Sequence, residues 1–257
     1  MKILITGSKG YVASSLISHL QKDNELVKIN RQSLDLRNEK DVNLFFARNG
    51  FFDALIHTAA EGGSRLKKDN SEILDNNLNC YYNLVKNKSN YNKFIHFGSG
   101  AEIYNIDSYY GLSKKVIRES IMHKKNFFNI RIFGVFDNNE LPTRFIKKSI
   151  NNYINKKPIE IYEDKKMDFF YMSDLIRLID FYLKCPNPPK EIDCSYNYSY
   201  TLKNIAEHIN SLGDHKVDIT CSEQKAENYI GQHTNLNINY KGLLTGIQET
   251  FNNMTSK

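Results

Sequence analysis

The segment from Lys2 to Ala13 constrains the fold of this chain more than any other part of the sequence. A short β-branched run ends at Thr6, a turn with glycine at positions 7 and 10 follows, and helical periodicity begins at Tyr11. Glycine permits a tight turn there and lets backbone N–H groups approach a phosphate, whose charge the start of the next helix then stabilises. This order of strand, turn and helix predicts a nucleotide-binding loop. Its residues are Gly7, Ser8, Lys9, Gly10, Tyr11 and Val12.

Strands and helices alternate along the first half of the chain. Short runs rich in β-branched residues occur at 2–6, 25–30, 54–58, 93–98 and 128–133, and stretches with helical periodicity lie between them, at 11–21, 39–48, 71–86 and 108–124. Alternation of this kind is typical of a parallel sheet covered on both faces by helices. The sequence thus predicts an α/β fold with a Rossmann-type doubly wound parallel sheet.

The alternation stops after Phe136, which indicates a second, smaller domain. Helical periodicity returns at 143–155, 173–184 and 202–212, and a short strand is expected at 159–162. We expect residues 1–135 to form the dinucleotide-binding domain, with a later segment at about 158–185 interleaved into it. Residues 136–257 are expected to form a small C-terminal α+β cap that binds substrate.

Composition and charge argue against several functional classes. The chain has 40% hydrophobic and 25% charged residues, which is the balance of a folded globular protein. Its net charge of +6 comes from Lys and Arg interleaved with acids, so there is no basic stripe for a nucleic acid. No apolar run approaches the ~18 residues of a membrane helix and no signal peptide is apparent, so we expect a cytoplasmic protein. Four scattered cysteines without a C-x-x-C pair predict neither disulfides nor a metal site.

Arg31 follows the second predicted strand, where many dinucleotide-binding proteins place an acid that bonds the ribose hydroxyl of NAD. A guanidinium offers forked donors that suit the dianionic 2′-phosphate of NADP instead. Lys9, in the glycine-rich loop, either adds a second cation to that phosphate or faces solvent. We therefore expect NADP(H) as the cofactor, with NAD(H) less favoured. The alternative is that Arg31 is an exposed loop arginine.

Tyr110 and Lys114 are four residues apart in a predicted helix, so their side chains share a face. An ammonium beside a phenol favours the phenolate and lowers the pKa of the tyrosine, which makes a proton donor and acceptor usable near neutral pH. The pair follows the fourth strand, at the carboxyl edge where a doubly wound sheet binds its ligands. Position distinguishes it from three pairs of the same spacing that we expect on solvated surface, namely Tyr82/Lys86, Tyr153/Lys157 and Tyr162/Lys166.

These motifs give the chain a resemblance to a known enzyme family. Over nearly its whole length it resembles the extended short-chain dehydrogenases/reductases, which are NAD(P)-dependent nucleotide-sugar epimerases, dehydratases and reductases. The residues that carry the resemblance are the glycine-rich loop, Asp35-Leu36, His57-Thr58-Ala59-Ala60, Asn77 to Asn83, the Tyr110/Lys114 pair, Arg131 and Asp168 to Asp174. Within the family the chain is most similar to 4-keto-6-deoxy sugar reductases of the GDP-fucose synthase type, through Arg31 and residues 7–10 and 42–46.

The resemblance implies roles for individual residues. Tyr110 would protonate the C4 oxygen of a 4-keto-6-deoxy sugar while NADPH delivers hydride, and Lys114 would hold the nicotinamide ribose and tune Tyr110. Further cofactor contacts would come from Asp35, Leu36, Ala59, Ala60 and Phe133. Substrate contacts would come from Ser99, Glu102, Tyr110, Gly134, Arg144 and Tyr171. The helices at 71–86 and 108–124 would form a homodimer.

The sequence departs from the family pattern at the third catalytic residue, at the nucleotide and sugar contacts, and at the residues that invert sugar carbons. The family usually has a Ser or Thr where Gly100 stands, as the third catalytic residue, and Ser99 precedes it. Either a local shift brings Ser99 into that place or the hydroxyl is missing. The Arg that usually precedes Asp168 is Met167, with Lys166 as the available substitute. The first departure concerns the hydroxyl that polarises the keto oxygen in the reaction. The second concerns the residues that contact the nucleotide and the sugar.

Reduction without epimerisation is the reaction that these residues favour. Fucose synthases also invert sugar carbons with a Cys and a His, but Glu102 stands at the Cys position and no His lies between Phe136 and Arg144. We therefore expect NADPH-dependent reduction of a nucleotide-linked 4-keto-6-deoxy sugar for a surface polysaccharide or glycan. Two alternatives stay open, a nucleotide-sugar 4-epimerase with tightly bound NAD and a non-catalytic NADP-sensing protein. The Tyr110/Lys114 pair argues against the second of these.

Overall fold

The chain divides into two units in a computed structural model that describes residues 1–64, 68–222 and 226–256. Unit 1 contains Met1–Arg131 and Asp180–Ile192, and unit 2 contains Ile132–Ile179 and Asp193–Lys257. The sequence predicts a segment at about 158–185 that returns to the first unit. The segment that returns is 180–192, because it leads into a strand at the edge of the sheet of unit 1.

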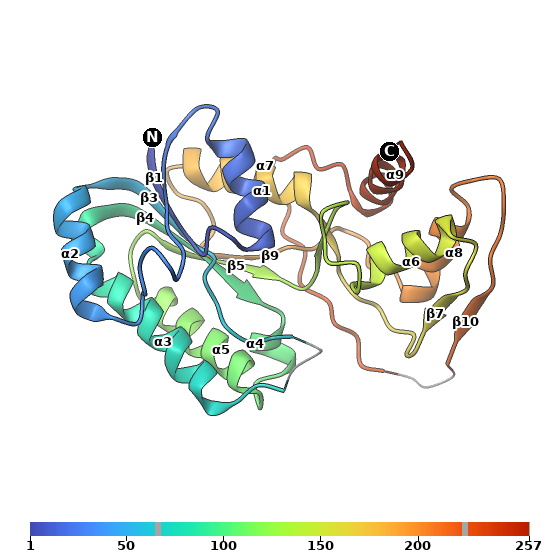
Figure 1. The fold of residues 1–257 in the computed structure, drawn as a ribbon, viewed down its shortest axis with the longest axis horizontal. Coiled ribbons are helices and arrows are strands. Elements are labelled where there is room, and N and C mark those ends of the chain that lie inside the picture. The colour runs from blue at the N-terminus through green and yellow to red at the C-terminus, as the bar shows by residue number, and fades with distance from the viewer. Residues whose placement is uncertain (65–67, 223–225, 257) are drawn as a thin grey trace. The chain divides into compact units, whose positions relative to one another are not determined.

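Unit 1 is built on a six-stranded sheet (Figure 1). Its strands are β1 (Lys2–Thr6), β2 (Glu25–Lys28), β3 (Phe52–His57), β4 (Tyr91–Ser99), β5 (Phe127–Ile132) and β9 (Glu191–Asp193). They follow the order β2-β1-β3-β4-β5-β9, and β1 pairs in parallel with β2 and β3, as β3 does with β4. The central strands contain continuous buried runs, such as Ile3 to Ile5 and Ala54 to Ile56, because both faces of the sheet are covered. The predicted Rossmann-type α/β fold is confirmed.

Helices cover both faces of this sheet. Unit 1 contains α1 (Tyr11–Leu20), α2 (Glu39–Asn49), α3 (Ser71–Lys86), a 3₁₀ turn at Lys88–Asn90, α4 (Ala101–Tyr104) and α5 (Tyr109–Met122). α1 lies on one face, and α2, α3 and α5 lie on the other (Figure 1). Two helices begin at side-chain caps, because Asn38 accepts from the backbone N–H of Asp41, and Ser108 accepts from that of Gly111. The cap at Ser108 fixes the first turn of α5, which carries Tyr110.

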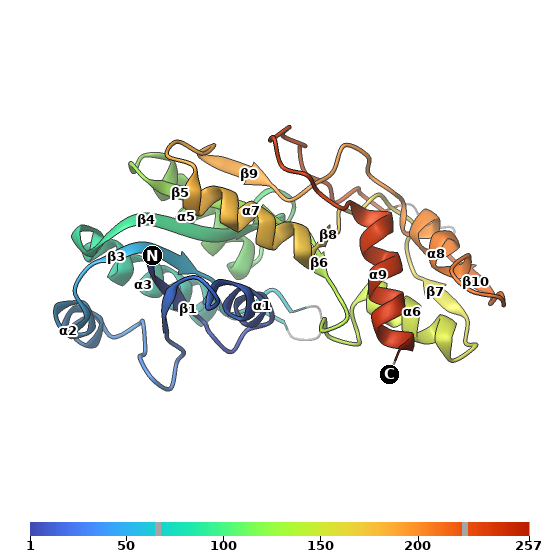
Figure 2. The same ribbon diagram turned by 90° about the horizontal axis from the view of Figure 1, so that it is seen from above.

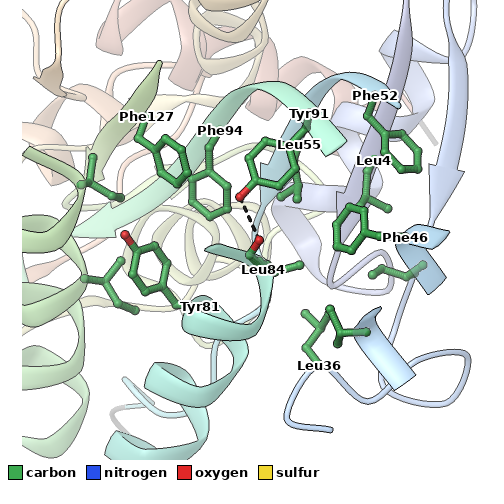
Figure 3. Close-up of a cluster of buried hydrophobic side chains, with 14 residues drawn as sticks. Leu4, Leu36, Phe46, Phe52, Leu55, Tyr81, Leu84, Tyr91, Phe94 and Phe127 are labelled. Carbon is green, nitrogen blue, oxygen red and sulfur yellow. Dashed lines mark hydrogen bonds between the residues drawn. The ribbon is translucent and has the colours of Figure 1, made fainter. Parts of the chain in front are cut away.

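A hydrophobic core of unit 1 lies between the sheet and the helices α2, α3 and α5 (Figure 3). Aromatic rings dominate this core, and Phe94 stacks on Phe127 with the ring centroids 4.7 Å apart. The Tyr91 hydroxyl donates to the Leu84 carbonyl oxygen at 2.9 Å, so this buried polar group is satisfied. The core thereby fixes α3 and α5, which carry candidate site residues, against the central strands.

Unit 2 is a smaller α+β assembly (Figure 2). Its elements are β6 (Val135–Phe136), α6 (Phe145–Ile154), β7 (Ile159–Ile161), β8 (Phe170–Tyr171), α7 (Met172–Lys184), α8 (Leu202–Asn210), β10 (Ile219–Cys221) and α9 (Leu243–Thr255), of which α7 continues into unit 1. β6 pairs with β8 and β7 pairs with β10, both in parallel. The helices α6, α8 and α9 pack around a second core that includes Ile146, Ile205 and Ile247. The predicted α+β character of this part of the chain is confirmed.

The described residues form neither a membrane-spanning helix nor a cluster of metal ligands. No helix in the described part of the chain has the length and apolar character that a bilayer span needs. Within residues 1–64, 68–222 and 226–256, no three His, Cys, Asp or Glu side chains are grouped as metal ligands. All four cysteines are free thiols, of which Cys194 is buried and Cys221 is exposed.

Candidate functional site

The glycine-rich turn joins β1 to α1 in a conformation that needs glycine. Gly7 has a φ of +65°, and a Cβ there would lie 2.9 Å from the Cα of Ala59 and from Thr58 Oγ1, just beyond the end of β3. The backbone N–H of Gly10 donates to the Gly7 carbonyl oxygen at 2.8 Å and closes the turn. Among the described residues no side chain caps α1, and its first turn carries no acid, so the positive end of this helix suits an anion.

A cavity of about 410 Å³ opens beside this turn, entirely within unit 1. Of the residues predicted to bind cofactor, it brings together Gly7, Lys9, Gly10, Arg31, Asp35, Leu36, Ala59 and Ala60. Ser8 lies within the turn and Tyr11 and Val12 begin α1, but these three residues do not line the cavity. The Lys9 ammonium donates to Gln32 Oε1 at 2.6 Å, so this lysine turns toward the loop after β2. The cavity has the size of a small-molecule site.

Two ion pairs lie on the rim of the cavity. Arg31 Nη1 donates to Glu61 Oε1 at 2.9 Å, and Arg37 binds Asp35 through Nε and through Nη2, the latter at 2.5 Å. The Arg37 guanidinium lowers the pKa of Asp35 to about 2, so this acid is ionised at neutral pH. Arg31 is 63% exposed, yet it already has a carboxylate partner. Sequence reasoning identified Arg31 and Asp35 but not their partners Glu61 and Arg37.

Asn77 of α3 links the rim of the cavity to α5. Its Oδ1 accepts from the backbone N–H of Glu61 at 2.8 Å, and its Nδ2 donates to the Glu61 carbonyl oxygen at 3.0 Å. The same Nδ2 donates to Ser113 Oγ on α5 at 3.0 Å. Ser113 immediately precedes Lys114, so the position of Glu61 is tied to the helix that carries the predicted catalytic pair.

Lys114 and Tyr110 lie on one face at the start of α5. Lys114 is 4% exposed, its Nζ donates to the Phe97 carbonyl oxygen at 2.6 Å, and the same atom is 5.7 Å from the centroid of the Tyr110 ring. Burial lowers the pKa of Lys114 to about 8, against the opposing effect of the Glu102 carboxylate. The Tyr110 ring packs on Gly63, where φ is +69° and a Cβ would lie 2.8 Å from Cε1. A half-buried phenol therefore stands beside a desolvated cation.

Ser99 ends β4, and Gly100 begins the turn into α4. The Gly100 backbone is helical, with a φ of −52° and a ψ of −21°, so no positive φ reserves this position for glycine. Ser99 Oγ accepts from the backbone N–H of Ala101 at 3.2 Å. The structure thus places the Ser99 hydroxyl at the carboxyl end of β4. Its catalytic role stays a prediction.

Glu102 lies in a buried ion-pair network of unit 1. It is 5% exposed, and its Oε1 accepts from Arg131 Nε at 2.5 Å and from Asn129 Nδ2 at 2.9 Å. Arg131 Nη2 also donates to Glu191 Oε2 at 3.0 Å, which joins β5 to β9. Gly98 leaves room for this network, since a Cβ there would lie 2.9 Å from Glu102 Oε2. The carboxylate is engaged inside unit 1, and its substrate contact stays a prediction.

The remaining predicted site residues belong to unit 2. Phe133 and Tyr171 are buried, and the Tyr171 hydroxyl donates to Glu249 Oε2 at 2.9 Å. The Gly134 carbonyl oxygen accepts a backbone hydrogen bond from β8 at 2.7 Å. Arg144 is exposed at the start of α6. The contacts of these four residues with cofactor or substrate stay predictions.

Comparison with known proteins identifies the family. Residues 3–197 match the model of the NAD dependent epimerase/dehydratase family. The chain belongs to this family. It is 21% identical to the CDP-abequose synthase of Yersinia pseudotuberculosis over 250 residues, which cover 85% of this chain and 87% of the relative. The predicted resemblance to extended short-chain dehydrogenases/reductases is confirmed.

Solved structures of similar fold include both epimerases and reductases. UDP-glucuronic acid 4-epimerase from Bacillus cereus has a TM-score of 0.77 and 20% identity, covering 100% of this chain and 99% of that chain. GDP-mannoheptose C4 reductase from Campylobacter jejuni has a TM-score of 0.73 and 18% identity, covering 99% of this chain and 98% of that chain. The first structure contains UDP-glucuronic acid and NAD, and the second contains NADP.

Membership of the epimerase/dehydratase family supports a pyridine nucleotide as the cofactor. The residues of unit 1 fit such a group, because glycine at position 7 lets the turn pack tightly against Thr58 and Ala59, and the uncapped start of α1 suits a pyrophosphate. Since one similar structure holds NAD and another holds NADP, the comparisons do not choose between the two cofactors.

One surface prediction for this family member is wrong. The sequence places Tyr153 on solvated surface, but Tyr153 is 1% exposed, and its hydroxyl donates to the His215 carbonyl oxygen at 3.0 Å. It lies on the buried face of α6, which also holds the isoleucines three and seven residues before it. Tyr82 and Tyr162 are 40% and 73% exposed, so the same prediction is confirmed for them.

Proposed function

We propose that this protein is an NADPH-dependent reductase of a nucleotide-linked 4-keto-6-deoxy sugar. The observation that carries the proposal is the Tyr110 ring beside the buried Lys114 ammonium in a member of the epimerase/dehydratase family. Arg31 and Lys9 on the cavity favour a cofactor that bears a 2′-phosphate. When bound, NADPH supplies the hydride for the keto carbon.

Tyr110 supplies the proton in this proposal. Reduction of a C4 keto group leaves negative charge on the C4 oxygen, which the Tyr110 hydroxyl neutralises by protonation. The Lys114 ammonium favours the phenolate that remains on Tyr110. Lys114 is buried with its Nζ on the Phe97 carbonyl oxygen, so water screens this interaction weakly. Ser99 would donate a second hydrogen bond to the same sugar oxygen.

A panel of substrates tests the proposed reaction. Purified protein is mixed with NADPH and the 4-keto-6-deoxy sugars of CDP, GDP, dTDP and UDP, and the loss of NADPH absorbance is followed. The similarity to a CDP-abequose synthase makes the CDP-linked sugar the first to test. We expect oxidation with one of the four nucleotides. NADPH binding without oxidation of any substrate would contradict the reductase assignment.

A nucleotide-sugar 4-epimerase is the second candidate function. The contact between Arg31 and Glu61 favours it, because a rim that presents an acid suits the ribose hydroxyls of NAD. The fold is also similar to that of a UDP-glucuronic acid 4-epimerase whose structure contains NAD. This candidate predicts NAD that stays with the protein through purification, together with conversion of a nucleotide sugar without net oxidation of added NADPH.

Reduction is expected to slow above pH 8. The pKa of Lys114 is about 8, so the side chain is a cation at pH 7 and becomes neutral at higher pH. The neutral amine no longer favours the Tyr110 phenolate, and kcat/KM, which reports the pKa values of the free enzyme, should fall by up to about tenfold per pH unit on the alkaline side. Lys114→Arg stays charged across this range and should show no such decline. A pH–rate profile of both proteins checks this, and equal alkaline declines would contradict the role of Lys114.

Substitutions at positions 99 and 100 decide which residue supplies the third catalytic hydroxyl. If Ser99 fills the role, Ser99→Ala should lower kcat by about 10²- to 10³-fold, and Gly100→Ser should have little effect. The Gly100 backbone accepts a serine without strain, because its φ is −52°. If the hydroxyl is missing, Gly100→Ser should instead raise kcat, while Ser99→Ala leaves it unchanged. Steady-state kinetics of the two variants distinguish these outcomes.

We also propose that the protein is a cytoplasmic homodimer in which α3 and α5 of two copies pack together. Large apolar side chains at α4 and at the start of α5 are exposed, which is typical of an interaction surface. They are Ile103, Tyr104, Ile106, Tyr109 and Leu112, with exposed fractions from 37% to 49%. Light scattering should give twice the chain mass of 29.9 kDa, and the mass of a single chain would contradict the proposal.

A further inference from the structure

Glu61 holds Arg31 from a fixed position on the rim of the nucleotide cavity. Its Oε1 accepts from Arg31 Nη1 at 2.9 Å, and its Oε2 accepts from Asn76 Nδ2 at 2.8 Å. The Glu61 backbone is held at both its N–H and its carbonyl oxygen by the Asn77 side chain, at 2.8 and 3.0 Å. Arg31 is 63% exposed on its loop, whereas Glu61 is tied to α3 through two residues. The acid is therefore the anchored member of the pair.

The other charged groups that line the cavity have hydrogen-bond partners of their own. Asp35 is bound by Arg37 through Nε and Nη2, which neutralises that acid locally. The Lys9 ammonium donates to the neutral amide oxygen of Gln32. Among the described residues that line the cavity, Glu61 is the carboxylate that forms an ion pair with Arg31. Arg31 is the guanidinium that we expect to bind the 2′-phosphate.

We propose that Glu61 sets the cofactor selectivity of this protein, because its carboxylate competes with the 2′-phosphate of NADPH for Arg31. The inference rests on the proposed function, since it takes the cavity to be the site of the adenosine end of the cofactor. NADPH brings a dianion to a guanidinium that already has a fixed carboxylate partner, and the two anions repel each other. NADH has no 2′-phosphate and leaves the Arg31 pair intact. Glu61 therefore narrows the preference for NADPH that Arg31 alone would give.

A double-mutant cycle on cofactor binding tests this inference with the full chain. Kd for NADPH and for NADH is measured by fluorescence titration for the wild type, Glu61→Gln, Arg31→Ala and the double variant. Glu61→Gln removes the charge but keeps the size of the side chain and an oxygen for Asn76. We expect it to lower the Kd of NADPH about tenfold and to change that of NADH by less than about threefold. In the Arg31→Ala background the effect on NADPH should shrink to less than about threefold.

Two controls separate the competition from other effects of the substitution. Glu39→Gln removes an acid that pairs with Lys86 away from the cavity, and it should leave both Kd values unchanged. Because the Arg31 and Glu61 side chains are 63% and 35% exposed, raising the salt concentration should reduce the effect of Glu61→Gln. A purely structural role of Glu61 would not respond to salt in this way.

The outcomes distinguish failure of the inference from failure of the proposed function. If the wild type binds NADPH and Glu61→Gln binds it with the same Kd, the inference is overturned and the proposed function stands. If neither NADPH nor NADH binds to the wild type or to any variant, the proposed function is contradicted and the inference with it.

Discussion

Tyr110→Phe is expected to lower kcat of the NADPH-dependent reduction by about 10²- to 10⁴-fold, which is the range that a positioned proton donor contributes. The substitution removes one oxygen from a side chain whose ring packs on Gly63, so the packing at the start of α5 is kept. NADPH should bind to the variant with an unchanged Kd, because Tyr110 does not line the nucleotide cavity. Steady-state oxidation of NADPH and a separate NADPH titration measure the two quantities.

The neighbouring tyrosine provides a matched control. Tyr109 is 42% exposed on the adjacent position of α5, and Tyr109→Phe should leave both kcat and the Kd of NADPH unchanged. If Tyr110→Phe keeps the wild-type kcat, the phenol is not the proton donor. If both variants lose activity equally, the loss comes from disturbance of the helix start and not from the missing hydroxyl of Tyr110.

Elements with their own periodic pattern could be predicted from the sequence, and elements defined by pairing could not. The predicted helix 71–86 has the bounds of α3, and the predicted strand 93–98 lies within β4. β9 was not predicted because it has three residues, and only its position beside β5 makes it a strand. α9 was missed although Leu243 and Ile247, on its buried face, have helical spacing, so a signal was present there.

Site residues within one continuous segment were predictable, whereas partners from distant segments were not. The glycine-rich loop could be recognised because strand, turn and helix follow one another directly in the sequence. Arg31 and Glu61 follow β2 and β3, which flank β1 on opposite sides, so the loops after both strands reach the same edge of the sheet. Arg131, on β5, likewise reaches Glu102, on α4. Such contacts depend on strand order, which a single sequence does not specify.

Arg131→Met is expected to lower the free energy of unfolding by about 3 to 5 kcal/mol, because it leaves a buried carboxylate without its cation. Glu102 is 5% exposed and keeps its hydrogen bond from Asn129 in this variant. Glu191 keeps Arg118, whose Nη2 donates to its Oε1 at 2.6 Å, so the substitution mainly affects Glu102. Urea unfolding at pH 7 measures the loss. Arg118→Met is the control, since its side chain is 26% exposed and the expected loss is about 1 kcal/mol or less.

A double variant separates loss of charge from loss of packing at Arg131. Glutamine at position 102 is neutral and still accepts from Asn129, so Glu102→Gln combined with Arg131→Met should recover most of the lost stability. Burial already raises the pKa of Glu102 while Arg131 opposes that effect, so in the single variant the pKa rises further above its value in the unfolded chain. The folded state then binds a proton that the unfolded state releases, and stability falls as the pH increases between the two pKa values. The deficit should therefore be larger at pH 8 than at pH 5. A deficit that is independent of pH and is not rescued by Glu102→Gln would mean that packing of the Arg131 stem, and not neutralisation of Glu102, stabilises β5.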